Sequence, residues 1–216
     1  MAERRRTAVL ISGRGTNLQA LIEHCAKPEA SAEIALVITD DPAAAGLERA
    51  RTAGIAAEVV EHREFADRRA FEGEIDARLQ AHDVDLVCLA GFMRVLSPGW
   101  VERWWNRALN IHPSLLPAFR GLDTHRRALE TGARIHGCTV HVVRAKLDAG
   151  PIIVQGAVPV HPDDTEDTLA ARVLQIEHRC YPLAVELVAS GRARVEDECV
   201  VTERTTTPDT VIVNPS

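Results

Sequence analysis

The chain has 216 residues, of which 46% are hydrophobic and 26% charged, and its net charge is −6 at pH 7. This length suits one well-buried domain, and the composition argues against intrinsic disorder. The negative charge argues against a nucleic-acid partner, because a general binder needs a basic surface to neutralise phosphates. No apolar run approaches the ~20 residues that span a bilayer, and no signal-like segment follows Arg4, so we expect a cytoplasmic protein without a membrane partner.

Short β-rich runs alternate with amphipathic segments over the first half of the chain. The runs expected to form strands are 8–11, 34–39, 57–60, 86–90 and 109–111. Helices are expected over residues 17–26, 44–53 and 65–81. This alternation is typical of βαβ units, so we predict an α/β fold with a mostly parallel, twisted sheet and helices on both faces.

The pattern changes after residue 120. We expect a helix near 124–131, followed by strands at 139–143 and 152–160 that pair antiparallel across a turn at 147–150. A long helix is expected to begin after Thr165, to continue past Pro182 and to stop near Gly191. The tail is expected to add a short strand or hairpin around 195–201, and residues 205–216 are expected to be frayed.

The five cysteines are widely separated and show no C-x-x-C spacing. They are Cys25, Cys88, Cys138, Cys180 and Cys199. We expect them to pack in the fold rather than to form a disulfide framework, and we predict no metal site.

The first expected strand leads directly into Gly13-Arg14-Gly15-Thr16-Asn17, where a helix begins. Backbone N–H groups and a helix N-terminus therefore meet at one point, which is typical of an anion site. Gly15 lets the backbone approach a phosphate closely, while Thr16 and Asn17 offer a hydroxyl and an amide. Taken alone, the loop fits a tight turn without a ligand equally well.

A dinucleotide-dependent oxidoreductase is the competing interpretation of this loop, with Asp40 or Asp41 holding a ribose. The dinucleotide fingerprint needs a third glycine for close helix packing, and this chain has Leu18 there. A monophosphate is therefore the better fit.

A second loop, residues 91–96, follows a buried strand and is unusually apolar for a connection. Apolar loops at strand ends often line ligand pockets. A loop that merely covers the core is the alternative, and it is a serious one for Phe92 and Met93.

Asn110 and His112 lie two residues apart at the end of an apolar run, so their side chains share one face of an extended strand, which Pro113 then ends. An amide N–H aimed at a developing oxyanion and a titratable imidazole beside it are what addition to a carbonyl requires. Asp148, in a later turn, adds a carboxylate that favours the charged form of the imidazole. Taken alone, such a triplet is more often a turn cap and a core histidine than a catalytic pair.

Ser114 suggests a Ser-His-Asp hydrolase, but no G-x-S-x-G nucleophile elbow surrounds it. The remaining histidines of this region lack the spacing of a metal site. His125 could line the substrate cleft, whereas surface or packing roles are expected for His136 and His141.

Four strings in this order resemble the glycinamide ribonucleotide formyltransferases of purine biosynthesis, and the match runs from Val9 to about Gly191. The strings are residues 10–20, 89–97, 110–117 and 147–152. The resemblance implies a formyltransferase-type Rossmann-like fold with an antiparallel C-terminal portion. It also implies one domain over 1–216, with a phosphate-binding half at 1–105, a catalytic and folate-binding half at 106–195 and a tail at 196–216.

The activity that the resemblance implies is transfer of the formyl group of 10-formyltetrahydrofolate, a co-substrate, to the amine of glycinamide ribonucleotide, with no metal. The implied catalytic residues are Asn110, His112 and Asp148. The implied substrate-binding residues are Gly15, Thr16, Asn17, Leu174, Gln175, Ile176 and Glu177. The implied folate-binding residues are Arg68, Met93, Arg94, Val95, Leu96, Asn110, Arg144, Ala145, Lys146, Leu147 and Asp148. The expected partners are these small molecules, and the expected assembly is a monomer or a homodimer.

The chain departs from the family pattern at Ala118, where a lysine is common, and at Phe119, where a tyrosine is frequent. Thr16 replaces a more usual serine and keeps the hydroxyl. The missing lysine puts in doubt any role of that loop in attracting the substrate, although Arg120 could substitute for it.

Several rivals share the catalytic strings. Methionyl-tRNA formyltransferase normally carries a further C-terminal domain, formyltetrahydrofolate deformylase an N-terminal one, and sugar-nucleotide formyltransferases extra sequence, none of which we expect here. A non-catalytic module that kept the folate pocket is the rival from another class, and the joint presence of Asn110, His112 and Asp148 argues against it.

Overall fold

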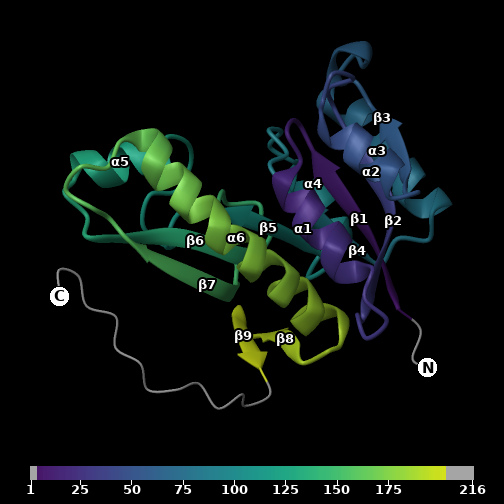
Figure 1. The fold of residues 1–216 in the computed structure, drawn as a ribbon. Helices are drawn as coiled ribbons and strands as arrows, with labels where there is room; N and C mark the ends of the chain where they lie inside the picture. The colour runs from purple at the N-terminus through teal and green to yellow at the C-terminus, as the bar shows by residue number, and fades with distance from the viewer. Residues whose placement is uncertain (1–3, 203–216) are drawn as a thin grey trace.

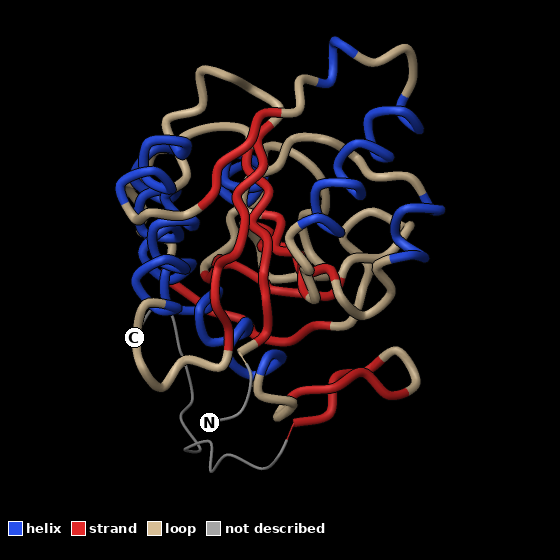
Figure 2. Tube along the Cα trace, turned by 90° about the vertical axis from the view of Figure 1, so that its right-hand side faces the viewer, coloured by secondary structure: helices blue, strands red, loops and turns tan. Residues whose placement is uncertain are grey.

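The structure is a computed structural model that describes residues 4–202. Its centre is a seven-stranded sheet in the order β3-β2-β1-β4-β5-β6-β7. Figure 2 shows the strands running between helices on either side. The predicted α/β fold with helices on both faces is therefore confirmed.

Five neighbouring strands of the sheet are parallel. They are β1 (Arg5–Ile11), β2 (Ala32–Thr39), β3 (Ala56–Val59), β4 (Leu86–Leu89) and β5 (Ala108–His112). Strands β1, β4 and β5 are almost wholly buried, as is usual for parallel strands covered on both faces. The order β3-β2-β1-β4-β5 is Rossmann-like, and it gathers the carboxyl ends of these strands along one edge.

The remaining two strands extend the sheet beyond β5 in antiparallel pairs. β6 (Ile135–Val142) pairs antiparallel with β5, and β7 (Ile152–Pro159) pairs antiparallel with β6. The expected antiparallel pair is confirmed, but β6 begins at Ile135 rather than at residue 139. His136 and Gly137, which disfavour a strand in sequence, are buried in it, and a side chain on Gly137 would collide with the backbone of β7.

One face of the sheet is covered by α1 (Thr16–Cys25) and α6 (Glu166–Ala189), which also pack against each other. Figure 1 shows α6 crossing β6 and β7 and reaching α1. α6 starts with a capping box at Thr165 and continues past Pro182 to a C-cap at Ser190, beside Gly191 with φ +77°. The predicted long helix is confirmed.

The opposite face is covered by α3 (Arg68–Ala81) and α4 (Pro98–Arg103), through the apolar side chains of both helices. α3 begins three residues later than predicted, because the Asp67 side chain caps it and 62–64 form a separate short helix, η1 (His62–Glu64). α4 was not predicted, although Ser97 caps it and Pro98 opens it. Its six residues are too few to show a helical period.

The other elements are short. α2 (Gly46–Thr52) begins two residues later than predicted, and α5 (Thr124–Glu130) agrees with its prediction. β8 (Ala193–Glu196) and β9 (Cys199–Thr202) form the expected hairpin. Four cysteines are buried as expected, whereas Cys199 is exposed on β9. The tail predicted to be frayed, residues 205–216, lies outside the described residues.

Within residues 4–202, every helix is too short or too polar to cross a membrane.

Candidate active site

Asn110 and His112 occupy alternate positions of β5, so both side chains point to the same face, as predicted. His112 is the last residue of the strand, and only 7% of its side chain is exposed. Its Nδ1 lies 3.4 Å from Asp148 Oδ2, and its Nε2 lies 3.0 Å from the Phe119 carbonyl oxygen. Both ring nitrogens therefore face acceptors, which the doubly protonated ring satisfies together.

Asp148 is held in a left-handed backbone conformation, with φ +48°, in the turn between β6 and β7. Its Oδ2 accepts a hydrogen bond from the Gly121 N–H at 2.9 Å, and its carbonyl oxygen accepts one from Arg120 Nε at 2.9 Å. The carboxylate is buried, with 7% of the side chain exposed. Two hydrogen bonds therefore link the turn that carries Asp148 to the 119–121 loop, which also contacts His112.

His141 belongs to the same cluster, although its sequence context predicted a surface or packing role. It pairs directly with Asn110 across β5 and β6, and its Nε2 lies 3.2 Å from Asn110 Nδ2 and 3.8 Å from Asp148 Oδ1. Burial lowers the pKa of His141, which favours the neutral ring. Nδ1–H then donates to the Val142 carbonyl at 3.0 Å, and Nε2 accepts from the Asn110 amide.

His141 therefore orients the Asn110 amide. The sequence signal that points to it is the pairing of two polar residues in neighbouring strands, and it appears only once the register is known.

Ser114 is fully buried and donates its hydroxyl to the Ala118 carbonyl at 2.7 Å. A serine committed to a turn in this way has no role as a nucleophile, which agrees with the rejection of the hydrolase reading. Ala118, at the position of the usual lysine, is exposed. Phe119 packs edge-on against His136, with ring centroids 5.8 Å apart.

His136 and His125 form a second histidine pair next to Phe119, with ring centroids 5.3 Å apart. His136 is almost fully buried, and burial lowers the pKa of its imidazole from 6.5 to about 4, with His125 and His112 adding to the effect. The packing role expected for His136 therefore fits its burial.

The buried imidazole predicts acid sensitivity of the fold. The unfolded chain binds a proton at His136 near pH 6.5, whereas the folded chain does so only near pH 4, so stability falls as the pH drops through this window. His136→Gln should reduce the loss of unfolding free energy between pH 7 and pH 4.5 by roughly 2 to 3 kcal/mol, measured by urea denaturation. The matched change at exposed His161 should leave the loss as it is, and an unchanged loss in His136→Gln would contradict the prediction.

The predicted phosphate loop, residues 13–17, lies at the carboxyl end of β1. Gly15, the N-cap of α1, has φ +66°, and a side-chain carbon there would come within 2.7 Å of the Gly46 Cα. No side chain caps α1, so its first N–H groups are free to bind an anion. The side-chain amide of Asn17 donates to Glu177 Oε2 at 2.7 Å.

The contact between Asn17 and Glu177 brings together two of the predicted substrate-binding segments, 160 residues apart. Both side chains are buried, and burial raises the pKa of the Glu177 carboxyl, while the Asn17 hydrogen bond opposes the rise. Of the neighbouring candidates on α6, Gln175 is exposed, Leu174 is half-buried and Ile176 packs against the core.

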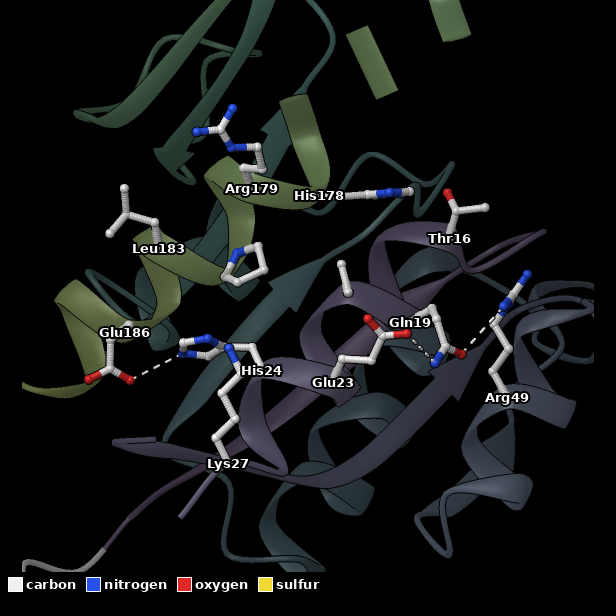
Figure 3. A pocket seen from close by; sticks show the side chains of 12 residues that line it. Thr16, Gln19, Glu23, His24, Lys27, Arg49, His178, Arg179, Leu183 and Glu186 are labelled. Atoms are coloured by element: carbon white, nitrogen blue, oxygen red, sulfur yellow. Dashed lines mark hydrogen bonds and ion pairs between the residues drawn. The ribbon is translucent and has the colours of Figure 1, made fainter. Parts of the chain in front are cut away.

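A groove of about 660 Å³ runs between α1 and α6, starting at Thr16 (Figure 3). His178 points across its upper end toward Thr16, and Arg49 reaches Gln19 on the same side. Asn110, His112 and Asp148 do not line the groove, so it is separate from their cluster.

The predicted folate loop, residues 91–96, divides into two sets of side chains. Phe92 and Leu96 are buried, and Phe92 stacks on Phe71 of α3. Met93 and Val95 are 66% and 61% exposed. The loop thus covers the core with one set and leaves the apolar side chains of the other set exposed.

The Asp40 carboxylate, which the oxidoreductase interpretation assigned to a ribose, is occupied by protein groups. Only 3% of the side chain is exposed, and its two oxygens lie 2.5 Å from Ser12 Oγ and Arg94 Nε. Its position therefore argues against that interpretation.

The remaining folate candidates lie outside the cluster of Asn110, His112 and Asp148. Arg68 is exposed in the first turn of α3. Arg144 turns toward the C-terminal hairpin, where it bonds Glu198 and Asn106 and lies over Trp105 at 3.7 Å. The three residues between Arg144 and Asp148 are exposed: Ala145, Lys146 and Leu147.

No group of three or more His, Cys, Asp or Glu side chains suited to a metal ion occurs in the part of the chain that the structure describes. The cluster of amide, imidazole and carboxylate at the carboxyl edge of a Rossmann-like sheet defines a group-transfer enzyme rather than an oxidoreductase. The chain belongs to the formyl transferase family, whose model matches residues 5–185.

Within this family, the chain is similar to proteins named for phosphoribosylglycinamide. It is 46% identical to phosphoribosylglycinamide formyltransferase of Escherichia coli over 88% of this chain and 89% of that protein. Its structure matches that of glycinamide ribonucleotide transformylase 1 from Symbiobacterium toebii with a TM-score of 0.91 and 48% identity, over 94% and 95% of the two chains. It is also 50% identical to the trifunctional purine biosynthetic protein adenosine-3 of Gallus gallus, over 88% of this chain. The chain spans about a fifth of that relative's length, 19%.

Proposed function

We propose that this protein transfers the formyl group of 10-formyltetrahydrofolate to the glycinamide amine of 5-phosphoribosylglycinamide. The products are formylglycinamide ribonucleotide and tetrahydrofolate, in de novo purine (IMP) biosynthesis. The observation that carries the proposal is the convergence of Asn110, His112 and Asp148, with the His112–Asp148 pair at 3.4 Å, in a member of the formyl transferase family.

In the proposed reaction, the amine attacks the formyl carbon, and the resulting tetrahedral intermediate carries a negative oxygen and a positive nitrogen. One N–H of the Asn110 amide points to His141, which leaves the other for the oxyanion. His112, as imidazolium, keeps its Nδ1–H toward Asp148, exchanges the Phe119 carbonyl for the oxyanion as the acceptor of its Nε2–H, and delivers that proton to the leaving folate nitrogen. The bond from carbon to that nitrogen breaks as the proton arrives.

The amine must lose one proton for the folate nitrogen to gain one. We propose that Asp148 directs this proton, through a water molecule, back to His112, with which it is paired. The step needs no metal and no covalent enzyme intermediate.

The two substrates would approach from different loops. The free N–H groups at the start of α1, with Gly15, Thr16 and Asn17, would hold the phosphate, and Glu177 the ribose and glycinamide portion. The exposed Met93 and Val95 would face the pterin, with the 144–148 segment as the opposite wall. We further propose a cytoplasmic monomer or homodimer that acts on these small molecules, without a nucleic-acid or membrane partner.

The test is an assay of tetrahydrofolate release from 10-formyltetrahydrofolate with and without 5-phosphoribosylglycinamide. Release that depends on the amine supports the proposal. Equal release without the amine would instead identify a folate hydrolase, and folate binding without release would identify a binding module.

A further inference from the structure

The carboxyl ends of β2, β1 and β4, which are neighbours in the sheet, meet at one buried carboxylate. Asp40 follows β2, Ser12 follows β1, and Arg94 lies in the loop after β4. Ser12 directly precedes the predicted phosphate loop, residues 13–17, and Arg94 belongs to the predicted folate loop, residues 91–96. Asp40 therefore stands between the two substrate-binding loops.

Ser12 is the junction of this network. Its backbone N–H donates to the Gly91 carbonyl at 3.2 Å, and its hydroxyl oxygen accepts from the Met93 N–H at 2.9 Å. Because that oxygen accepts from Met93, the hydroxyl proton points to Asp40 Oδ1, 2.5 Å away. The residue that leads into the phosphate loop is thus hydrogen-bonded to the backbone of the folate loop at two points.

Each carboxylate oxygen of Asp40 accepts a hydrogen bond from a side-chain donor. Ser12 donates to Oδ1, and Arg94 Nε donates to Oδ2 at 2.5 Å. A carboxylate supplies two acceptor oxygens, whereas an amide supplies one acceptor and one donor. Asparagine at this position would therefore break one of the two bonds while filling the same volume.

Burial of the carboxylate raises the free-energy cost of losing either of these hydrogen bonds. The Asp40 side chain is 3% exposed, and the Arg94 side chain is 40% exposed. A buried carboxylate is costly unless its partners remain in place. The pair therefore restrains Arg94, and with it the loop that presents Met93 and Val95.

We propose that Asp40 is a positioning residue that fixes the phosphate loop and the folate loop relative to each other. The proposal rests on the function proposed above. Asp40 itself touches neither substrate. Its carboxylate sets the position of the loop groups that do, so its loss weakens the binding of both substrates.

The test compares Asp40→Asn with Asp41→Asn by steady-state kinetics and by calorimetric titration with 5-phosphoribosylglycinamide and with tetrahydrofolate. Asp41 is the neighbouring, exposed acid, and its Oδ1 accepts from the Ala43 N–H at 2.9 Å, which asparagine can also do. We expect Asp40→Asn to raise KM and Kd for both ligands about tenfold, the scale of one lost charge-assisted hydrogen bond, with a smaller change in kcat. Asp41→Asn should change neither.

An Asp40→Asn protein that folds like the wild type and binds both ligands normally would overturn the proposal, as would weaker binding of only one ligand. A lower Tm with unchanged Kd values would show a purely structural role. If Asp40→Asn does not fold, Ser12→Ala removes the junction hydroxyl alone and is expected to weaken both ligands in the same way. Wild-type protein that binds both ligands without turnover would refute the proposed function, while the calorimetric comparison would still test the role of Asp40.

Discussion

His112→Ala is expected to lower kcat by about 10²- to 10⁴-fold, the range usual for loss of a general acid or base. The imidazole is the only titratable group of the cluster that faces both Asp148 and the opposite 119–121 loop, at 3.4 and 3.0 Å. Without it, the proton for the leaving folate nitrogen must come from water. KM for both substrates should change much less, because the two loops that hold them remain in place.

The matched control is His161→Ala, since His161 is an exposed histidine between β7 and α6. It should keep the wild-type kcat. Single-turnover kinetics with both variants separate the chemical step from product release. A His112→Ala enzyme with wild-type single-turnover rates would remove the histidine from the mechanism.

Asp148→Asn is expected to have the second largest effect, a fall in kcat on the order of 10²- to 10⁴-fold, as in other histidine–carboxylate pairs that lose the carboxylate. Asparagine can still accept the Gly121 N–H with its oxygen, so the fold of the turn should survive. Its NH₂ group would then face His112 Nδ1 and favour the neutral ring with its proton on Nε2. The charge that stabilises the imidazolium would be lost.

The pH dependence of kcat distinguishes this account from simple damage to the site. Because the mechanism needs His112 as imidazolium, loss of the neighbouring carboxylate should move the alkaline limb of the Asp148→Asn profile to lower pH, whereas a merely distorted site would lose activity equally at every pH. Asp167→Asn, at an exposed acid in the first turn of α6, serves as the control and should match the wild type.

Most of the fold follows from local patterns, because strands and helices of the βαβ half are long and periodic enough to identify. The exceptions have specific causes. The start of β6 contains His136 and Gly137, and the glycine is explained only by the close approach of the β7 backbone. α4 has six residues and no visible period.

The juxtaposition of Asn110, His112 and Asp148 could be predicted because Asn110 and His112 share a strand face and Asp148 stands in a recognisable turn. His141 could not, since its contact with Asn110 depends on the antiparallel register of β5 and β6. Asp40 was considered only for a dinucleotide, because nothing in the sequence shows that Ser12 and Arg94 occupy its two oxygens. Arg144 was assigned to the folate site, and only the position of the hairpin shows that its guanidinium is bound to Glu198.

The most direct test of the central claim follows the fate of the formyl carbon. A single turnover with ¹³C-formyl-labelled 10-formyltetrahydrofolate and 5-phosphoribosylglycinamide, observed by NMR, should place the label in formylglycinamide ribonucleotide in step with loss of the labelled folate. Label that appears as free formate, or that remains on the folate, would contradict the account.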